Sequence, residues 1–244
     1  MRRSIRSLIT SHNTMALVGQ WIGPAFTPAA STTVADESGN GNTGTLVGGD
    51  NTNTIASTDR PGTAGTHSLD LDGTNDRITL ADFAFSGTSP ISVMGWCKAD
   101  TDGNTLVGQG TEIILRQLGT GGRRPEFVLN SFTTNDRATG TSNTAPALGT
   151  WYHLAGCYNG STIRVYADGT QVATVTPTGT YANSASSFEI AATAGGTRWN
   201  GLVWDVRIYD SDESANLAAI MAEKDSSGGS AKPWYYHHQQ RVVS

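Results

Sequence analysis

Oxygen-bearing side chains gather in one short glycine-rich segment, ADESGNGNTGTL, at residues 35–46. Asp36, Asn40 and Asn42 carry carboxylate or amide oxygens, which are the ligands that a hard cation such as calcium prefers. The same composition is typical of a tight multi-turn loop, because Asn and Gly tolerate a positive φ. The segment therefore predicts either a calcium site, with calcium as the one cofactor that the sequence suggests, or a loop that needs no metal.

A further acidic residue stands in the middle of an apolar stretch, RWNGLVWDVRIYD, at residues 198–210. The alternation of side chains there predicts a strand, and Asp205 lies within it. An unpaired buried carboxylate is costly, so Asp205 requires a partner. Arg207 on the same face of the strand is one candidate, and a metal ion is the other.

The residue patterns that mark an enzyme are missing from the sequence. Glycoside hydrolysis commonly uses two carboxylates, which lie about 5–5.5 Å apart in retaining enzymes. No predicted strand carries closely alternating acids, and Glu112, Glu126 and Glu189 are isolated from one another. There is also no zinc-ligand spacing, no phosphate-binding loop and no supported Ser-His-Asp set. We therefore predict a protein that is not an enzyme.

Residues 150–177, TWYHLAGCYNGSTIRVYADGTQVATVTP, predict three antiparallel strands joined by two tight turns. The turns are predicted at Asn159-Gly160 and at Asp168-Gly169, because both dipeptides favour the positive φ angles of a two-residue hairpin loop. These loops would set the register of the three strands, since the side-chain period of a strand is two residues.

The predicted register sorts the side chains into an apolar face and a polar face. Val165 would lie opposite Leu154 across the first turn and opposite Val172 across the second. The apolar face is expected to pack in a core and the polar face to lie in solvent. The polar face holds His153, Arg164, Tyr166 and Gln171.

The rest of the chain favours an all-β, turn-rich protein. Gly is abundant at 29 residues and charged residues make up 15%, below the average of about 25%. Residues 211–224 predict one helix, because Leu217, Ile220 and Met221 follow the helical period, and Asp210 with Glu213 resembles a capping box. Further strands are predicted at 16–26, 67–71, 77–80, 90–99, 105–118, 126–129, 187–192 and 198–210.

The two ends of the chain differ in composition from the body at 16–225. Residues 1–15 form a basic arm without an acid, although the chain as a whole has a formal net charge of −5. The three arginines of this arm are too few for nucleic-acid binding, which takes roughly 6–10 phosphate contacts. Residues 226–244 predict a linker and an aromatic strap. The residues expected to dock on a protein partner are Arg2, Arg3, Ile5, Arg6, Leu8, Ile9, Trp234, Tyr235 and Tyr236.

Cysteine usage and hydropathy indicate where the chain folds. Cys97 and Cys157 both fall in predicted strands without secretory context, so we expect free thiols. No apolar run approaches the roughly 20 residues of a membrane span, and polar residues interrupt any signal-peptide core near the start. We therefore expect folding in a cytoplasm and no membrane partner.

Five motifs, in this order, resemble the laminin-G-like branch of the concanavalin A-like lectin and glucanase family: DESGNGNTGTL, SLDLDGTNDRITL, ISVMGWCKAD, GTWYHLAGCYNGSTIRVYADGTQVAT and NGLVWDVRIYD. The resemblance implies an all-β jelly-roll sandwich of two antiparallel sheets, to which the sequence adds one short C-terminal helix and extended arms at both ends. Some members bind calcium in loops. Carried over by position, the calcium ligands here would be Asp36, Asn40, Asn42 and Asp205.

The resemblance implies a binding scaffold, but a fold alone does not give a function. We predict a structural protein of a virus particle, a capsid decoration or accessory protein of a phage, displayed on the virion surface. Its arms would dock on the major capsid protein or on a second copy of the chain. The tail PWYYHHQQRVV after such a body also resembles phage-encoded members.

The alternative is an extracellular, calcium-dependent carbohydrate-binding lectin module or adhesin, whose partner is a host glycan. In that case His153, Arg164, Tyr166 and Trp199 would offer ring faces and hydrogen-bond donors to a sugar. Packing in the sandwich core is the competing expectation for Tyr166 and Trp199, because aromatic side chains supply much of such cores.

Overall fold

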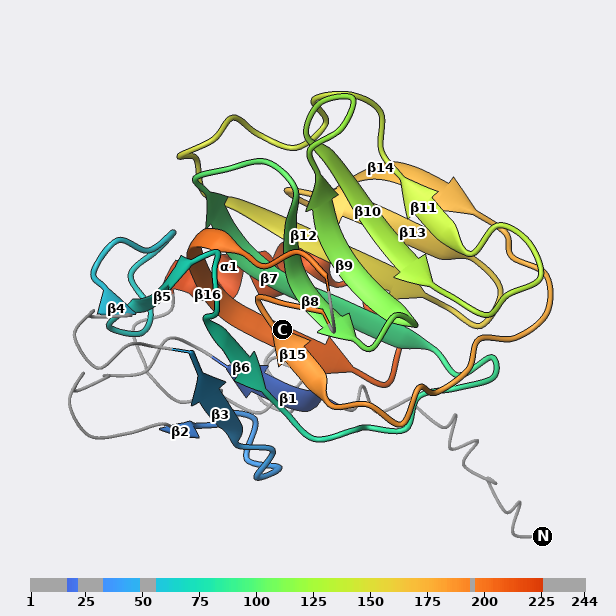
Figure 1. Ribbon diagram of the computed structural model, residues 1–244, viewed down its shortest axis with the longest axis horizontal. Helices are drawn as coiled ribbons and strands as arrows, with labels where there is room; N and C mark the ends of the chain where they lie inside the picture. Colours follow the sequence, from blue (N-terminus) through green and yellow to red (C-terminus); the bar gives the residue numbers. More distant parts are fainter. Residues whose placement is uncertain (1–16, 22–32, 49–55, 194–195, 226–244) are drawn as a thin grey trace, which may run out of the picture.

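The computed structural model describes residues 17–21, 33–48, 56–193 and 196–225. Within them the chain forms two antiparallel β-sheets packed face to face, followed by one short α-helix (Figure 1). The predicted sandwich with its C-terminal helix is therefore confirmed. Both predicted arms, at 1–15 and 226–244, lie outside the described residues, and so do their docking residues, Arg2, Arg3, Ile5, Arg6, Leu8, Ile9, Trp234, Tyr235 and Tyr236.

The first sheet is built around its two longest strands. β7 (Ile91–Ala99) pairs with β16 (Asn200–Tyr209) at the centre. On the side of β7 lie β12 (Tyr152–Tyr158), β13 (Ile163–Ala167) and β14 (Thr170–Val175). On the side of β16 lie β5 (Ser68–Asp72), β4 (Ala56–Ser57) and β1 (Leu17–Trp21).

The second sheet begins at its edge with β11 (Arg137–Thr139), β10 (Arg124–Leu129), β9 (Ile113–Leu118) and β8 (Asn104–Gln109). It continues with β15 (Phe188–Ile190), β6 (Arg77–Thr79), β3 (Gly44–Val47) and β2 (Thr33–Val34). The consecutive pairs β5–β6, β7–β8 and β15–β16 are each divided between the two sheets. These are three of the connections at which the chain crosses from one sheet to the other.

The core lies between the sheets and takes alternate side chains from each. Its largest fully buried members include Trp21, Phe127, Phe188 and Trp199. The packing is tight where the two sheets meet at Gly156, because a Cβ atom at this position would lie 2.2 Å from the ring of Phe127. A glycine is required at that point of β12.

The three-stranded meander at 150–177 is present, and its second turn is confirmed. Asp168 and Gly169 have φ angles of 48° and 72°, as a two-residue hairpin loop requires. However, a bulge between Val165 and Tyr166 shifts the pairing by one residue and places Val165 opposite Ala173. The predicted pairing of Val165 with Val172 is wrong for this reason.

The first turn of the meander differs from the prediction. Leu154 lies opposite Ala167, so the predicted register is wrong by two residues. The side-chain oxygen of Asn159 accepts hydrogen bonds from the backbone N–H groups of Ser161 and Thr162, at 3.0 and 2.8 Å. This side-chain turn lengthens the loop to four residues, and because the slip is even, the faces are not exchanged.

Helix α1 (Leu217–Ala222), followed by the 3₁₀ turn η1 (Glu223–Asp225), is shorter than predicted. The capping box at Asp210 and Glu213 is wrong, because Glu213 is fully buried and its carboxylate accepts hydrogen bonds from Ser211 and Asn216. The helix buries its apolar side chains against the outer face of the first sheet. That face was predicted to be exposed to solvent, but the helix covers part of it.

Cys97 and Cys157 are buried and free, which confirms the predicted thiols. Among the described residues, no helix is long and apolar enough to cross a membrane.

Candidate functional site

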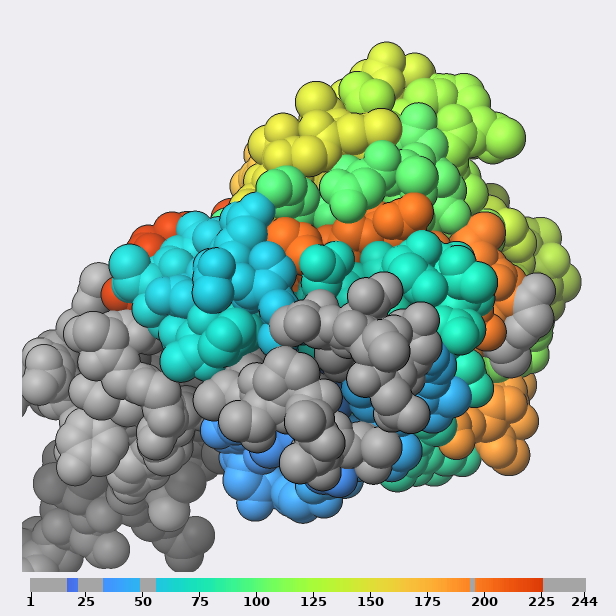
Figure 2. Space-filling model, turned by 60° about the vertical axis from the view of Figure 1, so that its left-hand side comes forward, coloured from blue at the N-terminus to red at the C-terminus, as the bar shows by residue number. Residues whose placement is uncertain are grey.

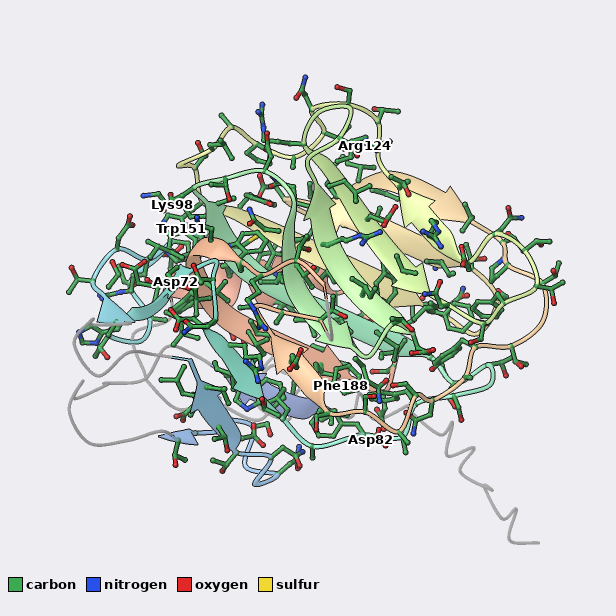
Figure 3. All side chains as sticks on the ribbon, in the orientation of Figure 1. Asp72, Asp82, Lys98, Arg124, Trp151 and Phe188 are labelled. Atoms are coloured by element: carbon green, nitrogen blue, oxygen red, sulfur yellow. The ribbon has the colours of Figure 1, made fainter. Side chains whose placement is uncertain are left out.

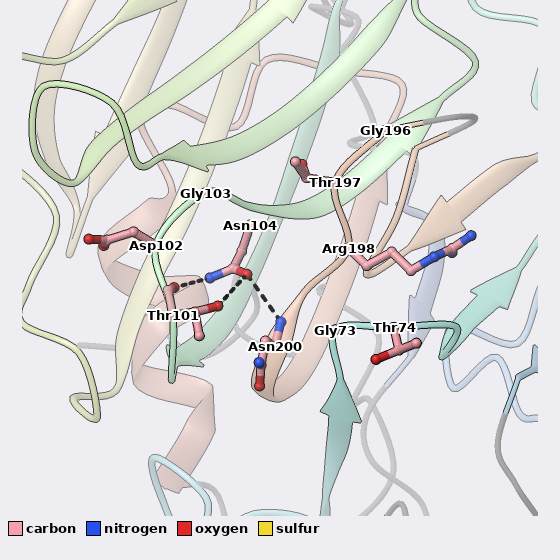
Figure 4. Close-up of a pocket in the computed structure, with 10 residues that line it drawn as sticks. All are labelled: Gly73, Thr74, Thr101, Asp102, Gly103, Asn104, Gly196, Thr197, Arg198 and Asn200. Atoms are coloured by element: carbon pink, nitrogen blue, oxygen red, sulfur yellow. Dashed lines mark hydrogen bonds between the residues drawn. The ribbon is translucent and has the colours of Figure 1, made fainter.

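A polar pocket of about 310 Å³ lies at one end of the sandwich, where the β5–β6, β7–β8 and β15–β16 connections meet (Figure 4). The β5–β6 turn contributes Gly73 and Thr74, and the β7–β8 turn contributes residues 101–104. Residues 196–198 and Asn200, which lead into β16, complete the lining. Figure 2 shows this part of the surface, where segments near residues 70, 100 and 200 (cyan, green and orange) meet.

Asn104 holds two walls of the pocket together. Its side-chain amide donates to the carbonyl of Thr101, and its amide oxygen accepts the backbone N–H of Asn200 at 3.2 Å. Asn104 is 2% exposed, so these bonds are shielded from water. Gly73 allows the β5–β6 turn to approach the same wall, since a Cβ atom there would lie 2.7 Å from the Cβ of Asn200. The pocket is therefore a rigid feature of the fold.

Two lining side chains have donor groups that the fold does not use. The guanidinium of Arg198 has no hydrogen bond or ion pair with any described residue, and its Nη1 atom is buried without a partner. No hydrogen bond among the described residues uses the side-chain amide of Asn200 either. In contrast, Asp102 already accepts a bond from Gln117, at 3.2 Å. The pocket can therefore offer charged and neutral hydrogen bonds to a polar ligand.

The four residues predicted to face a sugar do not form one exposed surface. Trp199, His153 and Tyr166 are 0%, 1% and 7% exposed, and Arg164 is held by Asp212 at 3.4 Å. The ring of Trp199 lies in the core between the sheets. Burial also lowers the pKa of His153 to about 3. These side chains are placed for packing, so the predicted glycan face is not present in this form.

Trp151, a partly buried aromatic residue, lies just before β12. Its indole N–H donates to Asp59 at 2.8 Å, and Lys98 bonds the same carboxylate at 2.6 Å. Figure 3 shows Lys98, Trp151 and Asp72 near one another at one end of the molecule. The ring of Trp151 is partly buried against the cluster of Trp96 and Trp204, so it serves mainly to cover that cluster.

The predicted calcium ligands Asp36 and Asp205 are brought together by Gln20 on β1. The backbone N–H of Gln20 donates to Asp36 at 2.9 Å, and its side-chain amide donates to Asp205 at 2.8 Å. Asp205 also forms a two-point ion pair with Arg207, at 2.6 and 2.9 Å. Of the two partners considered for Asp205, Arg207 is therefore the one observed.

The amide groups of Asn40 and Asn42 attach the glycine-rich loop to β1. Asn40 donates to the carbonyls of Leu17 and Val18, and Asn42 donates to Val18 at 2.7 Å. Among the described residues there is no group of three or more His, Cys, Asp and Glu side chains placed to hold a metal. The contacts of these residues are those of a loop that organises itself around the Asp36 carboxylate, and calcium binding there stays a prediction.

We expect Asp36→Asn to lower the free energy of unfolding by about 1 kcal/mol at pH 7. Burial raises the pKa of Asp36, but hydrogen bonds from Ser38 and from the backbone of Gln20 and Asn42 outweigh burial and hold the pKa below 3.8. A depressed pKa stabilises the fold above about pH 3.8, and this contribution is lost as the pH falls further. Urea unfolding at pH 7 and pH 2.5 should therefore show a smaller difference from wild type at the lower pH.

The exposed neighbour Glu37 supplies the control, since Glu37→Gln removes a charge from the same loop without removing those bonds. Melting with added calcium and with a chelator tests the other prediction for this loop. A calcium-dependent rise in Tm that disappears in Asp36→Asn would establish a metal site.

The sequence pattern predicted the ring of Trp199 as the sugar-binding group and did not identify its neighbours Arg198 and Asn200. Alternation along RWN is the signal that could have identified them, since neighbours of a buried residue in an extended segment point the other way. Thr101 and Gly73 carried no such signal, because only the packing of the two sheets brings their turns to the same place.

A family model described as the concanavalin A-like lectin/glucanases superfamily matches residues 72–216. No curated protein matches the chain. Among solved structures, domain 4 of AbnA, an extracellular GH43 arabinanase from Geobacillus stearothermophilus in complex with arabinotriose, has a TM-score of 0.62 at 18% identity, covering 85% of this chain and 98% of that domain.

Two longer proteins share the fold over part of their length. The ligand-binding domain of botulinum neurotoxin serotype D, in complex with N-acetylneuraminic acid, has a TM-score of 0.55 at 15% identity, over 85% of this chain and 50% of that one. Trypanosoma rangeli sialidase has a TM-score of 0.55 at 15% identity, over 87% of this chain and 33% of that one. The chain therefore spans half or less of these two proteins, and identities this low establish the fold alone.

Proposed function

Because the chain belongs to the concanavalin A-like lectin/glucanases superfamily, we propose that it is a carbohydrate-binding protein and that the pocket at the end of the sandwich is its binding site. The observation that carries this proposal is the pair of unused donor groups, on Arg198 and Asn200, in a pocket held rigid by Asn104. A saccharide is covered with hydroxyl groups, which such donors bind directly. The volume of about 310 Å³ is at the small end of the range for ligand pockets, about 300–1,000 Å³.

Ligands bound in two similar structures support the same class of ligand. One of these proteins was solved with arabinotriose and another with N-acetylneuraminic acid. Those ligands belong to the other proteins, and for this chain they indicate which classes of sugar to test first.

We propose binding without catalysis. The pocket lining contains a single carboxylate, Asp102, which already accepts a hydrogen bond from Gln117. Glycoside hydrolysis commonly uses two carboxylates, one to protonate the leaving oxygen and one to attack or to activate water. A lone, engaged carboxylate is better suited to orienting a hydroxyl group than to hydrolysis.

Attachment to a virus capsid depends on the arms, and the arm residues lie outside the described part of the chain. No contact among the described residues favours a capsid partner over a glycan, whereas the pocket favours a glycan. Glycan binding is therefore the function that we propose.

The expected effect of Asn200→Ala is a roughly tenfold weaker Kd for the best saccharide on a glycan array, with little change in Tm, because one hydrogen bond to the ligand is lost. Titration calorimetry with that saccharide provides the measurement. Thr180→Ala is the matched control, since this exposed residue lies beside Tyr181 at the opposite end of β7, where Tyr181 pairs with Gly87. An array without any bound saccharide, or equal binding by Asn200→Ala and wild type, would contradict the proposal.

A further inference from the structure

Among the arginines on or beside the strands, Arg198 and Arg124 of β10 each bury a guanidinium nitrogen that has no hydrogen-bond partner among the described residues, and of these two Arg198 is the one that lines the pocket. Arg116 on β9 pairs with Glu126, and Arg207 on β16 pairs with Asp205. Arg198 is partly buried in the pocket wall, yet it has no hydrogen bond or ion pair with any described residue, and its Nη1 atom is shielded from water. A shielded N–H group without an acceptor destabilises the fold. The pocket therefore offers a free guanidinium donor to an acceptor from outside the described chain.

The carboxylates near the pocket do not neutralise Arg198. Asp102 accepts a bond from Gln117, and Figure 4 shows the Asp102 and Arg198 side chains directed away from each other. Asp72 accepts the backbone N–H groups of Thr74 and Asn75, at 2.7 and 3.2 Å. Each acid is thus held by donors of the protein. Neither acid forms an ion pair with Arg198, so its guanidinium can pair with a carboxylate of a ligand.

We propose that the pocket selects an acidic sugar, in which a carboxylate binds the guanidinium of Arg198 while ring hydroxyls bind the amide of Asn200. This inference rests on the proposed function and names the class of ligand for the same site. The planar guanidinium presents two parallel N–H groups, and their spacing matches the two oxygens of a carboxylate. A neutral sugar satisfies the donors of Arg198 but leaves its charge uncompensated.

The test compares each acidic saccharide with its own methyl ester, which keeps the shape of the sugar and removes the charge. The probes are 3′-sialyllactose and trigalacturonate. Wild-type protein should bind at least one acid about ten- to a hundredfold more tightly than its ester, as expected for a charge-assisted pair. Raising the ionic strength from about 0.05 to 0.5 M should reduce that ratio, because salt screens partly exposed charges.

Arg198→Gln should bring the acid-to-ester ratio close to one, because it removes the positive charge that distinguishes the acid from its ester. Arg198→Lys keeps the charge but loses the planar fork, so its ratio should fall between those of Arg198→Gln and wild type. Arg137→Gln is the matched control, because Arg137 is an exposed arginine on β11, paired with Asp136. Its ratio should equal that of wild type.

Three outcomes would overturn the inference in distinguishable ways. If wild type binds acids and esters equally well, the selection of a carboxylate is wrong and the proposed function stands. If Arg198→Gln is folded and keeps the preference, another residue binds the carboxylate. If wild type binds no saccharide on the array, the proposed function fails and this inference fails with it. If Arg198→Gln does not fold, Arg198→Lys and the salt dependence of wild type decide the result.

Discussion

Replacing Trp199 with alanine is expected to lower the free energy of unfolding by about 3–5 kcal/mol. The ring is fully buried and belongs to the cluster between the two sheets. Its removal would leave a large cavity, because side chains from two stacked sheets cannot close together over the missing volume. The sequence alone also allowed this ring to be a surface for stacking on a sugar. If the ring packs in the core, Trp199→Ala loses stability. If the ring stacks on a sugar, Trp199→Ala loses saccharide binding instead.

Urea unfolding at pH 7 measures this effect directly. Leu148→Ala is a suitable control, since Leu148 is 41% exposed and surface substitutions usually stay within about 0.5 kcal/mol. A Trp199→Ala protein as stable as wild type that no longer binds its saccharide would contradict the structure of the core described above.

Asp205→Ala is expected to lower the free energy of unfolding by about 3–5 kcal/mol, because it leaves Arg207 buried without its main counter-ion. The two side chains of the pair are 3% and 4% exposed, so water cannot replace the lost carboxylate. Glu223 remains near Arg207 at 2.7 Å, but its side chain is 35% exposed and compensates only in part. Gln20 also loses an acceptor for its side-chain amide.

Backbone strain also contributes to the loss of stability in Asp205→Ala, and its contribution can be measured separately. Asp205 has a φ of 50°, in the left-handed region that Asn and Asp tolerate better than Ala. Asp205→Asn keeps that tolerance and removes only the charge, so it should cost less than Asp205→Ala. The exposed pair of Asp136 and Arg137 is the control, and Asp136→Ala should cost less than about 1 kcal/mol. A cost for Asp205→Ala no larger than for Asp136→Ala would show that the pair does not hold β16 in place.

Local chemistry explains which turns the sequence predicted correctly. Asp168-Gly169 closes as expected, since positive φ angles at both positions depend on these two residues alone. At Asn159 the side chain had two options, and it bonds the backbone of Ser161 and Thr162 instead of leaving a two-residue loop. A dipeptide pattern does not distinguish these options, because they differ by hydrogen bonds of similar strength.

The predicted solvent exposure of the polar face of the meander was wrong for a different reason. Period-two alternation identifies which residues share a face, but it does not state what covers that face. Here Leu217 and Ile220 of α1 pack over Met94 and Tyr166, which come from strands far away in the sequence. His153, on the same face, is also buried and its ring contacts Trp96, although its neighbours in the sequence marked it as a solvent-facing residue.

The sequence by itself determined the sandwich architecture, the meander and the free thiols, and it named Arg207 as a candidate partner for Asp205. The strands of the meander follow from side-chain periodicity, and Arg207 follows from its place on the same strand face as Asp205. The two-sheet sandwich was implied by the resemblance of five motifs to a known family, and the free thiols by the absence of secretory context. Only the tertiary structure decided the pocket. Gly73, Asn104 and Arg198 belong to three separate connections between the sheets, and they meet because the packing of every strand sets where those connections lie. The free donors of the site result from that packing, so no single segment of the sequence encodes them.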